Sequence, residues 1–539
     1  MDNLFTNLNR AGLFRAAVLA LLATLAPVAQ AQVSRDDVIF AGLMARSELP
    51  AYQQRGGDMS EIRPLMALPA APAGNSAGDM LMTYRSLTHA ILLIRATGWS
   101  ASSELTTALD FSINAKVLGA AEYLHTRAMF LFDAPLASEA PYRMELEIEK
   151  ADGSKEASVP PGIVLGDVRG RQAGESIGLS FDPSKLVGPG LHLLSATLKN
   201  GKDDTLYRYY RTFVIIPDVA KRLDALEKTV NLLADQSSPA ALTVRWVKES
   251  VALAHNTYLC GGFQDLTGFL YTNYRAAGLG LDEAMDYEAE LDSATKRAAA
   301  LQGGHDPLAG ATGDLHLAYR SSFDGKLVPY RIFIPSSYDR SRKYPLAVLL
   351  HGAGADENSF AVGYNKVFLR LAEQRGYILA AVNGRGFVSG YAKANGGEQD
   401  VLDLTGLIEK NYSIDPSRVY LAGHSMGGGG TWAVGLQYRD RYAALAPMAG
   451  TSISGNLEAA LSAPGRKIPV FVSCGGRDAL DTVSLCEPVV NKAKALGYPI
   501  KYTDYESADH LAVPVAAAPD VFDWFDAHVL EADPADARP

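Results

Sequence analysis

The chain has 539 residues, which is too long for one ordinary domain and indicates two to four compact units. Hydrophobic residues make up 48% of the sequence and charged residues 20%, a balance that is typical of globular proteins and excludes a fibrous or low-complexity chain. The formal net charge is −10, and no basic stripe is available to neutralise phosphates, so we expect no nucleic-acid partner.

The first segment has the pattern of a secretory signal. Arg10 and Arg15 precede a short apolar run at residues 16–29, and residues 29–31 read Ala-Gln-Ala. We expect cleavage after Ala31 and a periplasmic or secreted protein; the alternative is a buried N-terminal helix. The run is too short to anchor the chain in a bilayer, and no other stretch approaches spanning length, so we expect no membrane span after cleavage.

Three regions of different texture follow this signal. Residues 32–104 carry apolar residues at helical spacing and are predicted to be an N-terminal helical region. In residues 105–217, apolar and charged residues alternate between Gly-containing turns, which predicts a small β-sandwich-like insertion. Residues 218–303 return to helical spacing. Residues 304–313 are rich in glycine and are predicted to be a linker that few contacts cross.

From residue 314 to about 531, short apolar runs alternate with helical patterns. Residues 344–350 form a continuous apolar run, as expected of a parallel strand that is buried on both faces. A similar run occurs at residues 377–382, and further strands are predicted at residues 419–422, 467–473 and 500–506. This alternation predicts an α/β domain whose mostly parallel sheet is covered by helices on both faces.

The strongest motif is Gly423-His-Ser-Met-Gly427, which lies between a predicted strand and a predicted helix. A chain that turns sharply at this point needs small neighbours, and the turn leaves the Ser425 hydroxyl exposed beside the helix N-terminus. Such a hydroxyl is a weak nucleophile until a base accepts its proton. The motif therefore predicts Ser425 as a nucleophile; the alternative is an ordinary Gly/Ser surface turn.

Partners for this serine are expected later in the chain, in the order acid and then histidine. Only His510 and His528 follow Ser425; His510 lies in a loop after a predicted strand, whereas His528 lies in the terminal helix, so His510 is the predicted base. Asp478 lies in a Gly-rich turn after an apolar strand and is predicted to orient the imidazole. Two further carboxylates compete for this role, Asp481 and Asp509.

Two backbone amides are predicted to stabilise an oxyanion. One belongs to Met426, which directly follows the predicted nucleophile. The other belongs to Ala353, with Gly352 as the alternative, in the loop that follows the apolar strand at residues 344–350. His351 and His424 are expected to be structural.

The residues from His316 to about Leu530 resemble the α/β-hydrolase superfamily, and most closely its secreted bacterial feruloyl-esterase-like and polyhydroxybutyrate-depolymerase-like esterases and related predicted peptidases. The resemblance rests on residues 330–335, 344–352 and 414–428. It implies the triad Ser425, Asp478 and His510, and it implies carboxylic-ester hydrolysis through an acyl-enzyme on a small-molecule or polymeric ester. It does not extend to the first 310 residues.

Two other functions remain open on the sequence. A prolyl-oligopeptidase-like serine peptidase would use the same residues, and a non-catalytic binding protein would retain the fold alone. No metal-binding or nucleotide-binding motif is present, so we expect no cofactor and no metal. The sequence does not decide the oligomeric state or the role of the N-terminal region.

Cys474 and Cys486 flank a short loop. In an exported protein a disulfide between them is allowed, and we favour it slightly over two buried free thiols. Cys260 would then be unpaired.

Overall fold

The computed structural model describes most of the chain beyond its first 32 residues. The described ranges are 33–66, 77–95, 101–133, 140–150, 153–257, 266–267, 269–272, 285–386, 389–451, 457–478, 480 and 482–530. The predicted signal, including the cleavage position after Ala31, and Cys260 lie outside them. Within the described ranges, no helix is long and apolar enough to cross a membrane.

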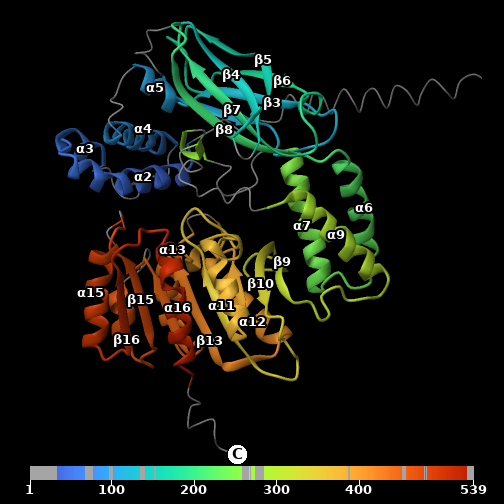
Figure 1. Ribbon diagram of the computed structural model, residues 1–539, viewed down its shortest axis with the longest axis vertical. Coiled ribbons are helices and arrows are strands. Elements are labelled where there is room, and N and C mark those ends of the chain that lie inside the picture. The colour runs from blue at the N-terminus through green and yellow to red at the C-terminus, as the bar shows by residue number, and fades with distance from the viewer. Residues whose placement is uncertain are drawn as a thin grey trace, which may run out of the picture.

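The N-terminal region is helical, as its spacing predicts (Figure 1). Its helices are α2 (Arg35–Gln54), α3 (Met59–Met66), α4 (Ala77–Ile94) and α5 (Ala101–Ala108). A reciprocal cap begins α2, because the Ser34 amide donates to Asp37 Oδ2 (2.8 Å) and the Asp37 amide donates to Ser34 Oγ (3.1 Å). Helices α2 and α4 pack against each other.

Two sheets follow these helices and share a core with them. A three-stranded sheet has the order β1-β3-β6 and a five-stranded sheet the order β2-β8-β7-β4-β5. The strands are β1 (Leu109–Ile113), β2 (Val117–Leu118), β3 (Leu124–Phe130), β4 (Tyr142–Glu149), β5 (Lys155–Gly166), β6 (Ser176–Phe181), β7 (Gly190–Lys199) and β8 (Thr205–Ile215). One hydrophobic cluster joins Ala41 of α2 and Tyr84 of α4 to Phe111 of β1 and Phe213 of β8. The helices and both sheets are therefore packed as one unit.

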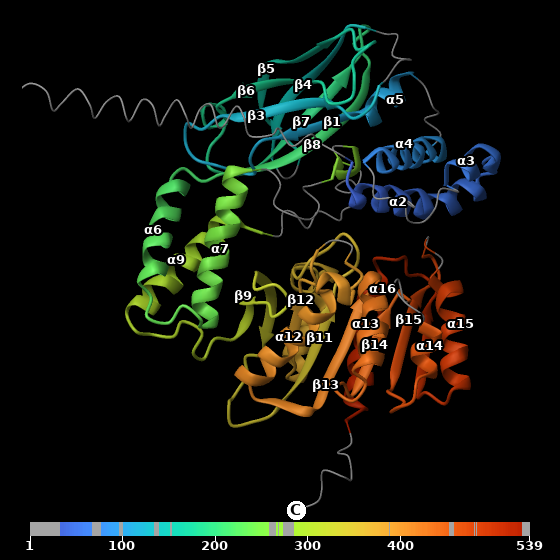
Figure 2. The ribbon, with the colours of Figure 1, turned by 180° about the vertical axis from the view of Figure 1, so that it is seen from behind.

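A second helical region connects this unit to the C-terminal unit. It contains α6 (Val219–Leu232), α7 (Pro239–Asn256) and α9 (Tyr287–Gln302). Ser238 and Asp286 cap α7 and α9 through their side-chain oxygens. The core of this region also includes Ala318 of strand β9 (Gly313–Arg320), so the helices cover the edge of the C-terminal sheet (Figure 2).

The C-terminal sheet has the order β16-β15-β14-β13-β11-β12-β10-β9. Along this order, each neighbouring pair from β16 to β12 is parallel. Strand β10 pairs antiparallel with both β12 and β9. The remaining strands are β10 (Leu327–Ile334), β11 (Tyr344–Leu350), β12 (Ile378–Val382), β13 (Ile414–His424), β14 (Ala444–Met448), β15 (Val470–Gly475) and β16 (Ile500–Tyr505). The prediction of a mostly parallel C-terminal sheet is confirmed.

Helices cover both faces of this sheet because its central strands are apolar on both sides. Leu346, Val348 and Leu350 of β11 belong to one core, whereas Ala347 and Leu349 belong to the other. The first core includes side chains of α12 (Gly397–Asn411), α13 (Met426–Gln437) and α15 (Thr482–Ala495), and the second includes side chains of α11 (Val367–Arg375) and α16 (Val513–Asp526). Two short helices complete the unit, α10 (Ser359–Val362) and α14 (Leu457–Ser462).

Contacts cross the stretch that the sequence predicts to be a linker. The Ala318 amide of β9 donates to Thr243 Oγ1 of α7 (2.9 Å), and both residues are fully buried.

A fragment comprising residues 312–539 would expose this edge and leave the Ala318 amide without its partner. We expect it to unfold about 10 °C or more below a fragment comprising residues 218–539, since a loss of several kcal/mol shifts Tm by about 2–4 °C per kcal/mol. Thermal unfolding of both fragments measures this; equal midpoints would show that the helical region contributes nothing to the sheet.

Candidate active site

The centre of the site is the turn between β13 and α13. Ser425 occupies this turn with φ 55° and ψ −116°, which is an uncommon conformation for a residue with a side chain. Strand β13 lies in the sheet between β11 and β14, so the turn is supported on both sides. The Ser425 amide donates to the carbonyl of Met448 on β14 (2.8 Å), which fixes the turn to the neighbouring strand.

Close backbone contacts explain the glycines around this serine. A Cβ at Gly423 would lie 2.3 Å from the Gly427 oxygen, and one at Gly427 would lie 2.0 Å from the Leu350 oxygen. Gly450, which follows β14, is equally constrained, because its Cβ would lie 2.0 Å from the Ser425 oxygen. The motif predicted the first two positions. Gly450 was missed, since nothing near it in the sequence indicates the contact.

The three predicted triad residues lie together although 85 residues separate the first from the last. Ser425 Oγ and His510 Nε2 are 2.8 Å apart, and His510 Nδ1 and Asp478 Oδ2 are 2.6 Å apart. Asp478 lies just after β15, and His510 lies between β16 and α16. This arrangement allows the imidazole to donate Nδ1–H to the carboxylate and to accept a hydrogen bond from the serine hydroxyl at Nε2, which is the geometry that general-base activation requires.

Asp478 is held as a carboxylate. Its Oδ1 accepts from the Leu480 amide (2.8 Å), and its Oδ2 accepts from Thr482 Oγ1 (2.6 Å) as well as from His510. Burial opposes ionisation, but the His510 contact and these hydrogen bonds outweigh it and hold the pKa of Asp478 below its ordinary value. The group is therefore charged at neutral pH and available to orient the imidazole.

The competing residues have other contacts. Asp509 is exposed, and its Oδ1 accepts from the amides of Leu511 and Ala512, so it stabilises the turn after the triad histidine. His528 contacts the Trp524 carbonyl through Nδ1 (2.7 Å) at the end of α16. Asp481 lies outside the described residues.

His424 has a definite contact that sequence reasoning did not identify. Burial lowers its pKa to about 3, so the ring is neutral at physiological pH. Its Nε2 lies 2.8 Å from the His510 carbonyl oxygen, and its Nδ1 lies 2.9 Å from the Tyr364 hydroxyl. A neutral ring donates from Nε2 to the carbonyl and accepts from the tyrosine at Nδ1. This residue therefore fixes the backbone that carries His510.

The two predicted oxyanion donors flank the serine. Met426 is the first residue of α13, where an amide has no partner within the helix. The loop after β11 passes close by, because a Cβ at Gly352 would lie 3.3 Å from the Ser425 Cβ, and Ala353 is the next residue. His351 anchors this loop, with its Nε2 2.7 Å from the Asn383 oxygen. The role of both amides stays a prediction.

The predicted disulfide is not formed. Cys474 and Cys486 are buried free thiols, on β15 and α15 respectively. The Cys474 thiol donates to the Thr482 carbonyl (3.5 Å), and the adjacent Cys486 thiol and burial raise its pKa well above the ordinary value. The two cysteines lie close together, as their short spacing suggests. Each side chain packs in the core as a small apolar group and is not bonded to the other.

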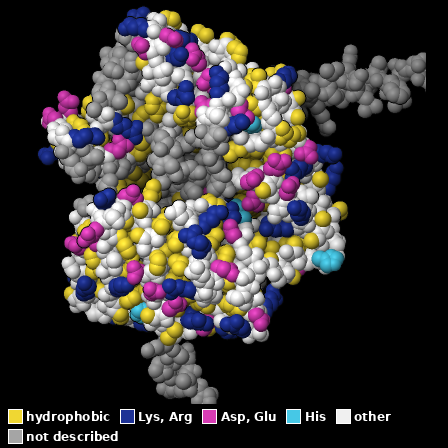
Figure 3. All heavy atoms as spheres, viewed as in Figure 1, with side chains coloured by type: hydrophobic (Ala, Val, Ile, Leu, Met, Phe, Trp, Pro, Cys, Tyr) yellow, Lys and Arg dark blue, Asp and Glu magenta, His cyan; other side chains and the backbone are white. Residues whose placement is uncertain are grey.

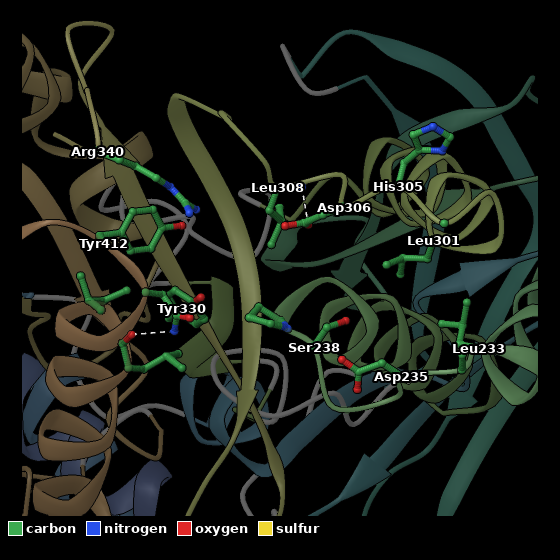
Figure 4. A pocket seen from close by; sticks show the side chains of 16 residues that line it. Leu233, Asp235, Ser238, Leu301, His305, Asp306, Leu308, Tyr330, Arg340 and Tyr412 are labelled. Carbon is green, nitrogen blue, oxygen red and sulfur yellow. Dashed lines mark hydrogen bonds between the residues drawn. The ribbon is translucent and has the colours of Figure 1, made fainter.

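A pocket of about 460 Å³ lies elsewhere in the molecule (Figure 4). Its lining includes Asp235 and Ser238 of the helical region and Arg340 and Tyr412 of the C-terminal unit. Tyr412 follows the end of α12 and precedes β13, whereas Ser425 lies after the other end of β13. The pocket therefore lies near the amino end of β13, whereas Ser425 lies at the carboxyl end of that strand. Across the described ranges, no group of three or more His, Cys, Asp or Glu side chains is placed to hold a metal ion.

No protein-family model matches the chain. A bifunctional acetylxylan esterase/xylanase of Neocallimastix patriciarum is 31% identical over 135 residues, which cover 25% of this chain and 19% of that protein. A probable feruloyl esterase C of Aspergillus flavus is 29% identical over 130 residues, which cover 23% of this chain and 47% of that protein. A feruloyl esterase module from Clostridium thermocellum, solved in complex with sinapinate, matches 42% of this chain and 93% of its own at 18% identity and a TM-score of 0.36.

Part of the chain is thus similar to known esterases, which agrees with the resemblance seen in the sequence. The match is limited in extent, because the chain spans less than half the length of these two curated relatives.

Proposed function

We propose that the protein is an exported serine hydrolase that cleaves carboxylic esters through an acyl-enzyme. The observation that carries this proposal is the chain of hydrogen bonds that links Ser425, His510 and Asp478. Its serine occupies the strained turn after β13, a central strand of the sheet. Export rests on the signal pattern at residues 1–31. The esterase relatives support ester hydrolysis over a peptidase or a non-catalytic role.

The geometry accommodates the acyl-transfer steps without rearrangement of the three side chains. Ser425 Oγ attacks the ester carbonyl while His510 Nε2 takes its proton, and Asp478 stabilises the resulting imidazolium. The amides of Met426 and Ala353 receive the developing oxyanion. His510 then returns the proton to the leaving alcohol, and in the second half-reaction it activates the water that releases the acid.

Access to the site is shaped by the N-terminal part of the chain. The carboxyl ends of β13 to β16 point toward helices α2 to α4, as both ribbon views show. The surface is hollowed between the α2–α3 side and the C-terminal unit (Figure 3). We infer that the substrate, a small-molecule ester or an ester on a polymer, enters between these parts. Exposed Leu511, beside His510, offers an apolar contact for its acyl group.

A substrate panel tests this function. Purified protein is assayed with p-nitrophenyl acetate, methyl ferulate, acetylated and feruloylated xylan, polyhydroxybutyrate and chromogenic peptides. We expect turnover of the activated ester and of at least one natural ester, and none of the peptides. If the protein cleaved the peptides and none of the esters, it would be a serine peptidase and the proposal would be wrong. If it turned over no substrate and a fluorophosphonate did not label it, it would be a non-catalytic binding protein.

A further inference from the structure

A buried histidine between two carboxylates joins the helical region to the C-terminal unit. His316 of β9 contacts Glu290 of α9 through Nδ1 (2.8 Å) and Glu357 through Nε2 (3.0 Å). The imidazole and both carboxylates are almost inaccessible, with side-chain exposures of 4%, 13% and 4%. Because each ring nitrogen faces a carboxylate oxygen, both nitrogens are donors and the ring is an imidazolium.

The electrostatics of this cluster agree with that assignment. Burial disfavours the cation, but the hydrogen bonds and charges of Glu290 and Glu357 prevail and raise the pKa of His316 to about 9. Both carboxylates have pKa values below their ordinary range, despite burial, because of the same histidine. The neighbouring Asp356 has its pKa raised to about 7, first by burial and then by the charge of Glu357.

From this cluster the contacts continue to the predicted oxyanion loop. Glu357 Oε2 accepts from Asn383 Nδ2 (2.7 Å), and the Asn383 carbonyl accepts from His351 Nε2 (2.7 Å). Asn383 follows β12, and so it fixes both His351, at the start of the loop, and Glu357, at its end. Ala353, the predicted oxyanion donor, lies between these two fixed points.

We infer that Glu290 and His316 are positioning residues, which hold the loop of residues 351–357 in its catalytic geometry through Glu357 and Asn383. The inference rests on the proposed function for the meaning of that loop. It gives the helical region a part in catalysis, because Glu290 is supplied by α9, outside the C-terminal unit. A displaced loop moves the Ala353 amide away from the oxyanion, and a displacement of about 1 Å at a reacting centre costs on the order of 10²-fold in rate.

The test compares Glu290→Ala and the milder Glu290→Gln with Thr243→Val in the full chain. Thr243→Val is a matched control, since it removes a different buried hydrogen bond between the helical region and β9, one that lies outside the path to the loop. For Glu290→Ala we expect kcat on a small activated ester to fall about 10- to 100-fold with KM within about two-fold. Glu290→Gln, which keeps an acceptor for His316, should recover part of this loss. Thr243→Val should lower Tm and leave kcat within about two-fold.

Hydrogen exchange gives a second readout that does not depend on catalysis. Amides of residues 351–358 should exchange faster in Glu290→Ala and Glu290→Gln than in wild type. In Thr243→Val their exchange rates should equal those of wild type. If the Glu290 variants lose only Tm, with kcat and loop exchange unchanged, the contact is merely structural and the inference is overturned. Faster loop exchange in a protein that hydrolyses no ester would instead retain the coupling and refute the proposed function.

Discussion

Replacing Ser425 by alanine is expected to abolish ester hydrolysis, with kcat lowered on the order of 10⁴-fold or more. The reason is that His510 then has no hydroxyl to deprotonate, and the residual rate comes only from binding and the oxyanion donors. The same variant should lose all covalent labelling by a fluorophosphonate probe, whereas its thermal midpoint should stay near that of wild type. Alanine is under the same backbone strain as serine at a φ of 55°, so we expect the substitution to change the free energy of unfolding little.

Ser417→Ala is the matched control for this experiment. Ser417 lies on the same strand, β13, near its opposite end, and its hydroxyl donates to Asp415 Oδ1 (2.7 Å). We expect this variant to be labelled and to turn over esters like wild type. Undiminished labelling of Ser425→Ala would place the nucleophile at another serine and remove the central proposal.

The sequence predicted the parts of the site that local pattern determines. Ser425, Asp478 and His510 each follow a parallel strand, and parallel strands bring their carboxyl ends to the same end of the sheet. Their mutual contacts could therefore be expected from order along the chain. Their catalytic roles remain predictions until the variants are measured.

Contacts between distant segments could not be predicted in this way. His316 carries no local sign that it meets Glu290 and Glu357, because these partners are 26 and 41 residues away on other elements. Cys474 and Cys486 show a related limit: their spacing brings the two thiols side by side, but it does not determine whether they are bonded, and in this structure both are free. A glycine-rich stretch likewise marks a turn in the backbone, not an absence of contacts between the segments on either side of it.

Replacing Asp478 by asparagine is expected to lower kcat on the order of 10⁴-fold while the fold is preserved. The direction follows from the hydrogen bonds around the carboxylate. The Leu480 amide can only donate, so the asparagine oxygen must stay opposite it, where Oδ1 lies now. The side-chain NH₂ then occupies the position of Oδ2, beside Thr482 and His510. The threonine hydroxyl adapts by rotating to accept a hydrogen bond.

The imidazole cannot adapt without loss of function. Facing an NH₂ group, its Nδ1 must become the acceptor, and the proton moves to Nε2, where it points at Ser425 Oγ. This tautomer cannot take the serine proton. Asp509→Asn is the matched control, since Asp509 is adjacent to His510 and its carboxylate only accepts from the Leu511 and Ala512 amides. Steady-state kinetics on a small ester should show the large loss in Asp478→Asn alone, together with a KM close to that of wild type. If Asp509→Asn or Asp481→Asn were the inactive variant instead, the acid would have been assigned to the wrong residue.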